Sequence, residues 1–186
     1  MKYIWDLKFK LLLFLVLFSF VLPYRLFALK IEAINRYFNE NGHLVINLGF
    51  KDFPLQEVIL ALKRQKEDVE IIYEIELYRK GFFRDQIMDK LAYYQRAGYL
   101  SEKNLYYLED NNKQLLYERP EDLVRDLLAL PTFTLHSFPF GEIDKRNFFL
   151  IVQVTLKYKT HFNDKLRYTT KEKEVVKRSS KKYALP

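Results

Sequence analysis

The amino-acid sequence predicts an α+β protein, built mainly from antiparallel β-sheet with two short amphipathic helices. Several segments alternate apolar and polar residues as half-buried strands do, and the longest lies in residues 67–85. Two other segments begin at Pro54 and Pro120 and repeat apolar residues at helical spacing. The connections between successive strands are short, which favours antiparallel pairing and helices on one face of the sheet.

The first half of the chain contains a predicted hairpin, a helix and a long strand. Alternating segments on both sides of Asn41-Gly42 predict the hairpin over residues 29–50. The helix covers residues 54–65 and has its apolar residues on one face. In the long strand that follows, one side carries apolar residues and the other carries Glu70, Glu74 and Glu76. We therefore expect one face of this strand in the core and the other in water.

The second half repeats this order of elements. Tyrosine-rich segments predict strands at residues 91–100, 104–110 and 113–119, with a turn at residues 110–112. A helix over residues 121–130 ends before Pro131. Strands at residues 132–138 and 147–159 complete the domain. Hairpin, helix and strand thus occur twice, which suggests a loose internal duplication.

Composition excludes several classes of protein. The 186 residues, 49% hydrophobic and 17% aromatic, suit one packed domain of residues 29–160 plus a targeting segment. The absence of cysteine excludes disulfides, thiolate metal sites and a cysteine nucleophile. Five glycines leave no glycine-rich phosphate loop. We predict no cofactor.

The net charge of +7 belongs to the two ends of the chain. Residues 1–28 contribute +3 and residues 160–186 contribute +5, so residues 29–159 are nearly neutral at −1. We therefore predict no nucleic-acid partner. Residues 161–186 are predicted to form a basic, flexible tail that either contacts an anionic surface or only keeps the chain in solution. Its cationic residues are Lys171, Lys173, Lys177, Arg178, Lys181 and Lys182.

Residues 1–28 have the features of an export signal. A basic head precedes an apolar run over residues 11–22, which would span only about 18 Å as a helix, against about 30 Å of hydrocarbon. A signal peptide cleaved after Ala28 fits best, an uncleaved membrane anchor is the alternative, and a buried core helix is a third interpretation. The first two place the domain across the inner membrane, either in the periplasm or anchored with an extracytoplasmic domain.

The acidic row and the histidines are the first candidates for chemistry. Glu74 and Glu76 would lie about 7 Å apart on one face, a spacing that overlaps that of paired glycosidase carboxylates. They lie side by side on an open face, however, so we interpret them as a solvated surface. His43, His136 and His161 lie in separate segments without a metal or triad motif. We predict no catalytic, cofactor-binding or metal-binding residue.

The tyrosines form a dense set that permits two interpretations. They are either a stacking or apolar-ligand platform or simply pairs that stabilise neighbouring strands, which is the preferred interpretation. The residues are Tyr93, Tyr94, Tyr99, Tyr106, Tyr107 and Tyr117.

From about residue 29 to residue 160 the chain carries, in this order, the segments "GHLVINLGF", "ILAL", "VEIIYEIELYR" followed by Phe82-Phe83, "LAYYQRAGYL", "LYYLED", "LVRDLLAL" and "FFLIVQVTLKY". With these segments the chain resembles an uncharacterised bacterial family, domain of unknown function 4390. The resemblance implies an exported or membrane-anchored protein and, for some members, a link to a two-component sensor kinase. It implies no activity. A Leu-Pro segment and a Trp are expected after the last strand, where this chain has its basic segment.

These observations favour a non-catalytic, membrane-associated envelope module that binds a membrane surface or another envelope protein. Two alternatives remain. The first is an envelope glycan hydrolase that uses carboxylates such as Glu74, Glu76 and Asp85. The second is a carrier that holds a lipid tail between sheet and helices.

Overall fold

The computed structural model describes residues 29–136, 147–164 and 167–185, and their side chains except for Ile34 and residues 162–181. The predicted signal or anchor segment, residues 1–28, lies outside these ranges. The α+β class with antiparallel sheets and two helices is confirmed. Along the described ranges, no helix is both long enough and apolar enough to cross a membrane.

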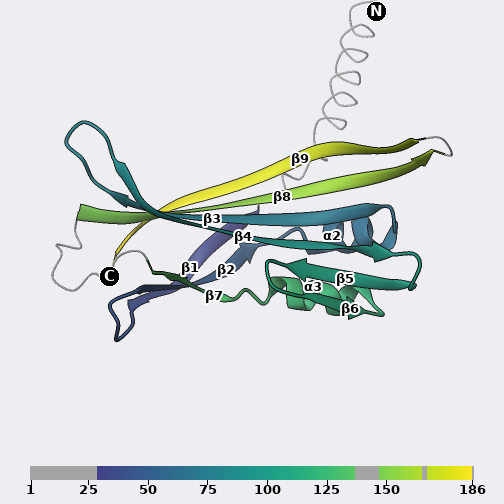
Figure 1. Cartoon of the computed structure of the whole chain (residues 1–186), viewed down its shortest axis with the longest axis horizontal. Coiled ribbons are helices and arrows are strands. Elements are labelled where there is room, and N and C mark those ends of the chain that lie inside the picture. Colours follow the sequence, from purple (N-terminus) through teal and green to yellow (C-terminus); the bar gives the residue numbers. More distant parts are fainter. Residues whose placement is uncertain (1–28, 137–146, 165–166, 186) are drawn as a thin grey trace, which may run out of the picture.

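Two antiparallel sheets form the framework (Figure 1). The larger has six strands in the order β6-β5-β4-β3-β8-β9 and the smaller has three in the order β1-β2-β7. The strands of the larger sheet are β3 (Glu67–Arg79), β4 (Gln86–Leu100), β5 (Leu105–Asp110), β6 (Gln114–Tyr117), β8 (Phe148–Asp164) and β9 (Arg167–Ala184). Those of the smaller sheet are β1 (Lys30–Phe38), β2 (Leu44–Asp52) and β7 (Thr132–Leu135).

Strand β3 is central because it pairs along its whole length with β8 on one side and over nearly all of it with β4 on the other. Its two faces are as different as the alternation predicts. The side chains that face the core are fully buried: Val69, Ile71, Tyr73, Ile75 and Leu77. The intervening residues are only partly buried, so β3 sets which face of the larger sheet is packed and which is open.

The two helices cross between the sheets in opposite directions. Helix α2 (Leu55–Lys63) leads from β2 in the smaller sheet to β3 in the larger, and α3 (Pro120–Leu128) leads from β6 back to β7. Both bury apolar residues, such as Leu62 and Leu127, in the same core. Hairpin, helix and strand therefore recur in sequence order, but the second set has its hairpin in the larger sheet and its strand in the smaller.

The C-terminal segment differs from the predicted flexible tail. Strand β8 continues to Asp164, and residues 167–184 return beside it as the edge strand β9. The prediction missed β9 because "KEKEVVKRSSKK" has no apolar alternation. A charged segment still forms a strand when a long neighbour supplies its backbone partners, and lysine is common on exposed edges because it discourages pairing with other chains.

Tyr183 near the end of β9 connects the two sheets. Its buried ring lies in the core, and its hydroxyl accepts the N–H of Ala33 at 2.9 Å and donates to the carbonyl of Ile31 at 3.3 Å. Both partners belong to β1 in the smaller sheet. The C-terminal strand therefore closes the core.

Two neighbouring isoleucines on β3 test the assignment of its faces. We expect Ile71→Ala to lower the free energy of unfolding by about 2–5 kcal/mol, because Ile71 is fully buried and its loss leaves a cavity. The same change at the half-buried Ile72 on the other face is expected to cost much less. Urea unfolding of both variants measures the difference, and equal losses would contradict this orientation of β3.

Candidate functional site

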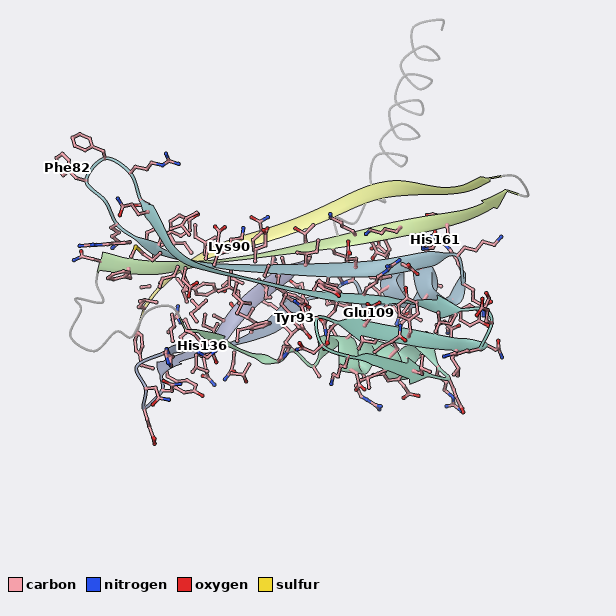
Figure 2. The ribbon with its side chains drawn as sticks, viewed as in Figure 1. Phe82, Lys90, Tyr93, Glu109, His136 and His161 are labelled. Atoms are coloured by element: carbon pink, nitrogen blue, oxygen red, sulfur yellow. The ribbon has the colours of Figure 1, made fainter. Side chains whose placement is uncertain are left out.

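The face of the larger sheet that carries Glu70, Glu74 and Glu76 is called the open face here. Its polar side chains are partly exposed, whereas the opposite face packs on the helices and the smaller sheet. In Figure 2, Lys90 and His161 lie on the open side, while Tyr93 and His136 lie on the packed side. Of the candidates for acid–base chemistry, Glu74, Glu76 and His161 are on the open face.

Lys90 of β4 joins the two candidate carboxylates of β3. Its Nζ lies 3.0 Å from Oε1 of Glu74 and 2.9 Å from Oε1 of Glu76. The hydroxyl of Tyr78 donates to Oε2 of Glu76 at 2.8 Å. The hydrogen bonds from Lys90 and then Tyr78 lower the pKa of Glu76, although burial opposes them. A general acid near neutral pH needs a raised pKa, so the environment of Glu76 is the opposite of the one that this role requires.

Asp85, the third carboxylate of the hydrolase alternative, is separate from this pair. It is exposed in the loop between β3 and β4, where its Oδ1 accepts the N–H of Gly81 at 3.4 Å. The three carboxylates therefore do not line one cleft.

Asp68 at the start of β3 has the most polar partners on the open face. It is only 5% exposed. Its Oδ2 accepts Nε of Arg96 at 3.1 Å and Nη2 at 2.6 Å, and it lies 2.8 Å from Nε2 of His161. Tyr107 also bonds to Asp68, and burial together with this carboxylate raises the pKa of the Tyr107 hydroxyl.

Gly98 gives this cluster its space. A Cβ at Gly98 would lie 2.1 Å from Oδ1 of Asp68 and 2.6 Å from Cε1 of Tyr107, so any side chain there would displace them. The sequence does not reveal the cluster because its members lie far apart along the chain. The one sequence sign of such a close approach is the glycine within a strand, Gly98, which lies opposite Tyr107.

The Asp68 and His161 pair resembles two members of a hydrolytic triad, but its surroundings do not support catalysis. Arg96 and Tyr107 occupy the same carboxylate, and no hydroxyl among the described residues hydrogen-bonds the other ring nitrogen of His161. The cluster joins β3, β4, β5 and β8 across the open face. We interpret it as a structural connection.

The other two histidines come together at the edge of the smaller sheet. The rings of His43 and His136 meet edge to face with centroids 5.1 Å apart. Among the described residues, no three or more His, Asp or Glu side chains form a group that could hold a metal ion.

The six tyrosines do not form one platform. Tyr93 packs on Tyr73 and Phe133 in the core, and Tyr106 and Tyr107 are both buried. Tyr94 is exposed. Because the set is divided between the two faces of the sheet, it contributes to packing rather than to a shared stacking surface.

Two pockets formed by described residues are small compared with what a lipid tail needs. One of about 300 Å³ lies between the β4–β6 region and α3, with Tyr93, Asp110 and Asp126 in its wall. A second of about 250 Å³ lies between α2 and β8. Ligand pockets usually have about 300–1,000 Å³, so these two are at or below the lower end.

The loop at the end of the β3–β4 hairpin exposes two large apolar side chains. Phe82 is 95% exposed and Phe83 is 96% exposed. Figure 2 shows Phe82 at the far end of this loop, away from both sheets. In the sequence, both residues belong to the segments that resemble the family, and neither was a predicted site residue.

The predicted anionic-surface residues all lie on β9. Their strand neighbours on β8 run from Thr160, opposite Lys171, to Ile151, opposite Lys182. The side chains of Lys171, Lys173, Lys177, Arg178 and Lys181 lie outside the described ones. Lys182 is exposed, and its Nζ lies 3.5 Å above the ring of Phe149.

Removal of the Asp68 carboxylate tests its structural role. We expect Asp68→Ala to destabilise the protein by about 2 kcal/mol or more, because it leaves Arg96 and Tyr107 without their buried partner. Asp122→Ala is the matched control, since its pair with Arg125 is exposed, and we expect it to cost less than about 1 kcal/mol. Chemical unfolding measures both, and similar small losses would show that the cluster does not stabilise the sheet.

Comparisons with family models, curated proteins and solved structures found no match for this chain. Membership of the family that the sequence resembles therefore stays a prediction. A functional proposal therefore rests on the geometry of the described residues.

Proposed function

We propose that this protein is a non-catalytic interaction module of the cell envelope, exported across the inner membrane and associated with an envelope surface. The single observation that carries the non-catalytic part is the bridge from Lys90 to Glu74 and Glu76. The one ammonium group offsets part of the negative charge of the two candidate carboxylates, which lie on an open face. Export rests on the sequence of residues 1–28, and a link to a sensor kinase rests on the family resemblance alone.

The shape of the domain supports a binding role. A six-stranded sheet with one uncovered face offers a broad surface, and the projecting hairpin offers a second point of contact (Figure 1). The charges of the open face are largely joined to one another, for example Glu70 to Lys159 at 3.1 Å. Such a polar face is stable in contact with water when no partner is bound, and it is suited to transient binding.

The location can be tested with a tag after Pro186. In bacterial spheroplasts we expect externally added protease to remove the tag, because export places the domain outside the inner membrane. The same tag on a cytoplasmic protein is the control and should survive until the cells are lysed. A tag that is equally protected in the full chain would contradict export.

The absence of hydrolysis can be tested with purified cell-wall glycan. We expect the wild-type protein to release no reducing ends, because Glu76 has a lowered pKa and is held by Lys90. Glu76→Gln and the exposed control Glu118→Gln are then indistinguishable from wild type. Hydrolysis that Glu76→Gln abolishes and Glu118→Gln retains, at equal stability, would establish the hydrolase instead.

A further inference from the structure

The exposed aromatic pair at the end of the β3–β4 hairpin is unusual for a surface loop. A large apolar side chain in water is common singly, but two adjacent phenylalanines that are almost fully exposed contribute nothing to the core. The rings contact each other edge to face with centroids 4.8 Å apart. Ile87, which is 56% exposed on the neighbouring strand, extends this apolar end.

The backbone of the loop holds the two rings away from the body. Strand β3 pairs with β8 as far as Arg79, opposite Phe148, and the N–H of Lys80 still donates to the carbonyl of Asn147 at 2.7 Å, so residues 81–85 extend beyond the paired part. A Cβ at Gly81 would lie 2.0 Å from the carbonyl oxygen of Arg84, which makes glycine necessary for this tight turn. The Asp85 carboxylate accepts the N–H of Gly81 across the same turn. The loop therefore presents Phe82 and Phe83 on a compact support.

Cations surround the aromatic pair. Arg79, Lys80 and Arg84 are exposed next to it, and Asp85 is the one acidic residue between 79 and 87. Three positive charges and one negative charge give the loop a net charge of +2. The end of the loop is apolar and the residues just behind it are basic. This arrangement complements a layer with an apolar interior and anionic groups at its surface.

We propose that Phe82 and Phe83 insert into the interfacial region of an anionic lipid bilayer, with Arg79, Lys80 and Arg84 against the headgroups. Lipids can rearrange around a projecting, convex loop. Aromatic rings favour the headgroup region of a bilayer. The inference deepens the proposed function by naming the surface with which the module associates.

The test uses the full chain with one fluorophore on the loop. Because the chain has no cysteine, Phe83→Cys creates a single labelling site for an environment-sensitive dye. Asn112→Cys in the exposed turn between β5 and β6 is the matched control. Residues 1–28 are present in both variants, so any attachment through them acts equally on both labels.

With vesicles that contain phosphatidylglycerol, we expect the dye at position 83 to shift its emission to shorter wavelength. Lipids that carry a spin label in the upper acyl chain should quench more than half of this emission, and the dye at position 112 should not respond. Adding Phe82→Ser should lower the equilibrium constant for insertion of the loop about tenfold, because burial of one phenylalanine is worth at least that factor. Leu116→Ser, on a 43% exposed leucine of β6, is the control for the loss of an apolar residue elsewhere.

The charges have their own test. The double variant Arg79→Gln with Arg84→Gln should leave the vesicles at a lower salt concentration, because fewer cations then attract the loop to the headgroups. Salt weakens this attraction because charges are screened within about 8 Å at physiological ionic strength. The pair Arg119→Gln with Arg125→Gln on and beside α3 is the control and should leave the salt midpoint unchanged. Equal insertion into vesicles of phosphatidylcholine alone would overturn the role of the cations.

The outcomes separate this inference from the proposed function. A chain that co-sediments with vesicles while the dye at position 83 stays in water would overturn insertion of the loop and leave membrane association intact. A chain that does not co-sediment would overturn both. A dye that is shielded only when envelope proteins are added, without quenching by spin-labelled lipid, would show that the loop binds a protein and would also overturn the inference.

Discussion

The register of β3 is the constraint on which the rest of the structure depends. The side-chain period of a strand is two, so a slip of one residue would place Glu70, Glu74 and Glu76 in the core and Ile71 and Ile75 in water. Burial of unpaired carboxylates is costly, which excludes the slipped pairing. Because β4 and β8 pair with this one strand, its register also determines which of their side chains meet on each face.

Strands and turns that a local residue pattern determines could be predicted from the sequence. Alternation identified β3, and the turns at Asn41-Gly42 and at Asp110 have the structure their residues predict. The side-chain oxygens of Asn39 and Asp110 accept backbone N–H groups there, and Gly42 has a φ of 73°. Strand β9 was missed because its pairing depends on β8, whose length beyond Thr160 no local pattern reveals.

The site features were harder to predict, for the same reason. Glu74 and Glu76 lie on the open face as the alternation indicates, but Lys90, which joins them, lies on another strand. Asp68, Arg96 and His161 come together only because three strands are in register. Exposure of Phe82 and Phe83 depends on how far the hairpin extends beyond β8, which is a property of the sheet and not of the loop sequence.

The contact between Tyr183 and β1 has a consequence for the order in which the chain can fold. The hydroxyl joins residues 150 positions apart, so the N–H of Ala33 has no such partner until Tyr183 has been synthesised. At about 5–20 residues per second, this delay is on the order of ten seconds. Contacts of such long separation are formed late because closing the loop costs entropy before it gains the contact. Strand β1 can pair with β2 early, but its contact with Tyr183 forms only after β9 has been made, so this side of β1 stays accessible to chaperones during the interval.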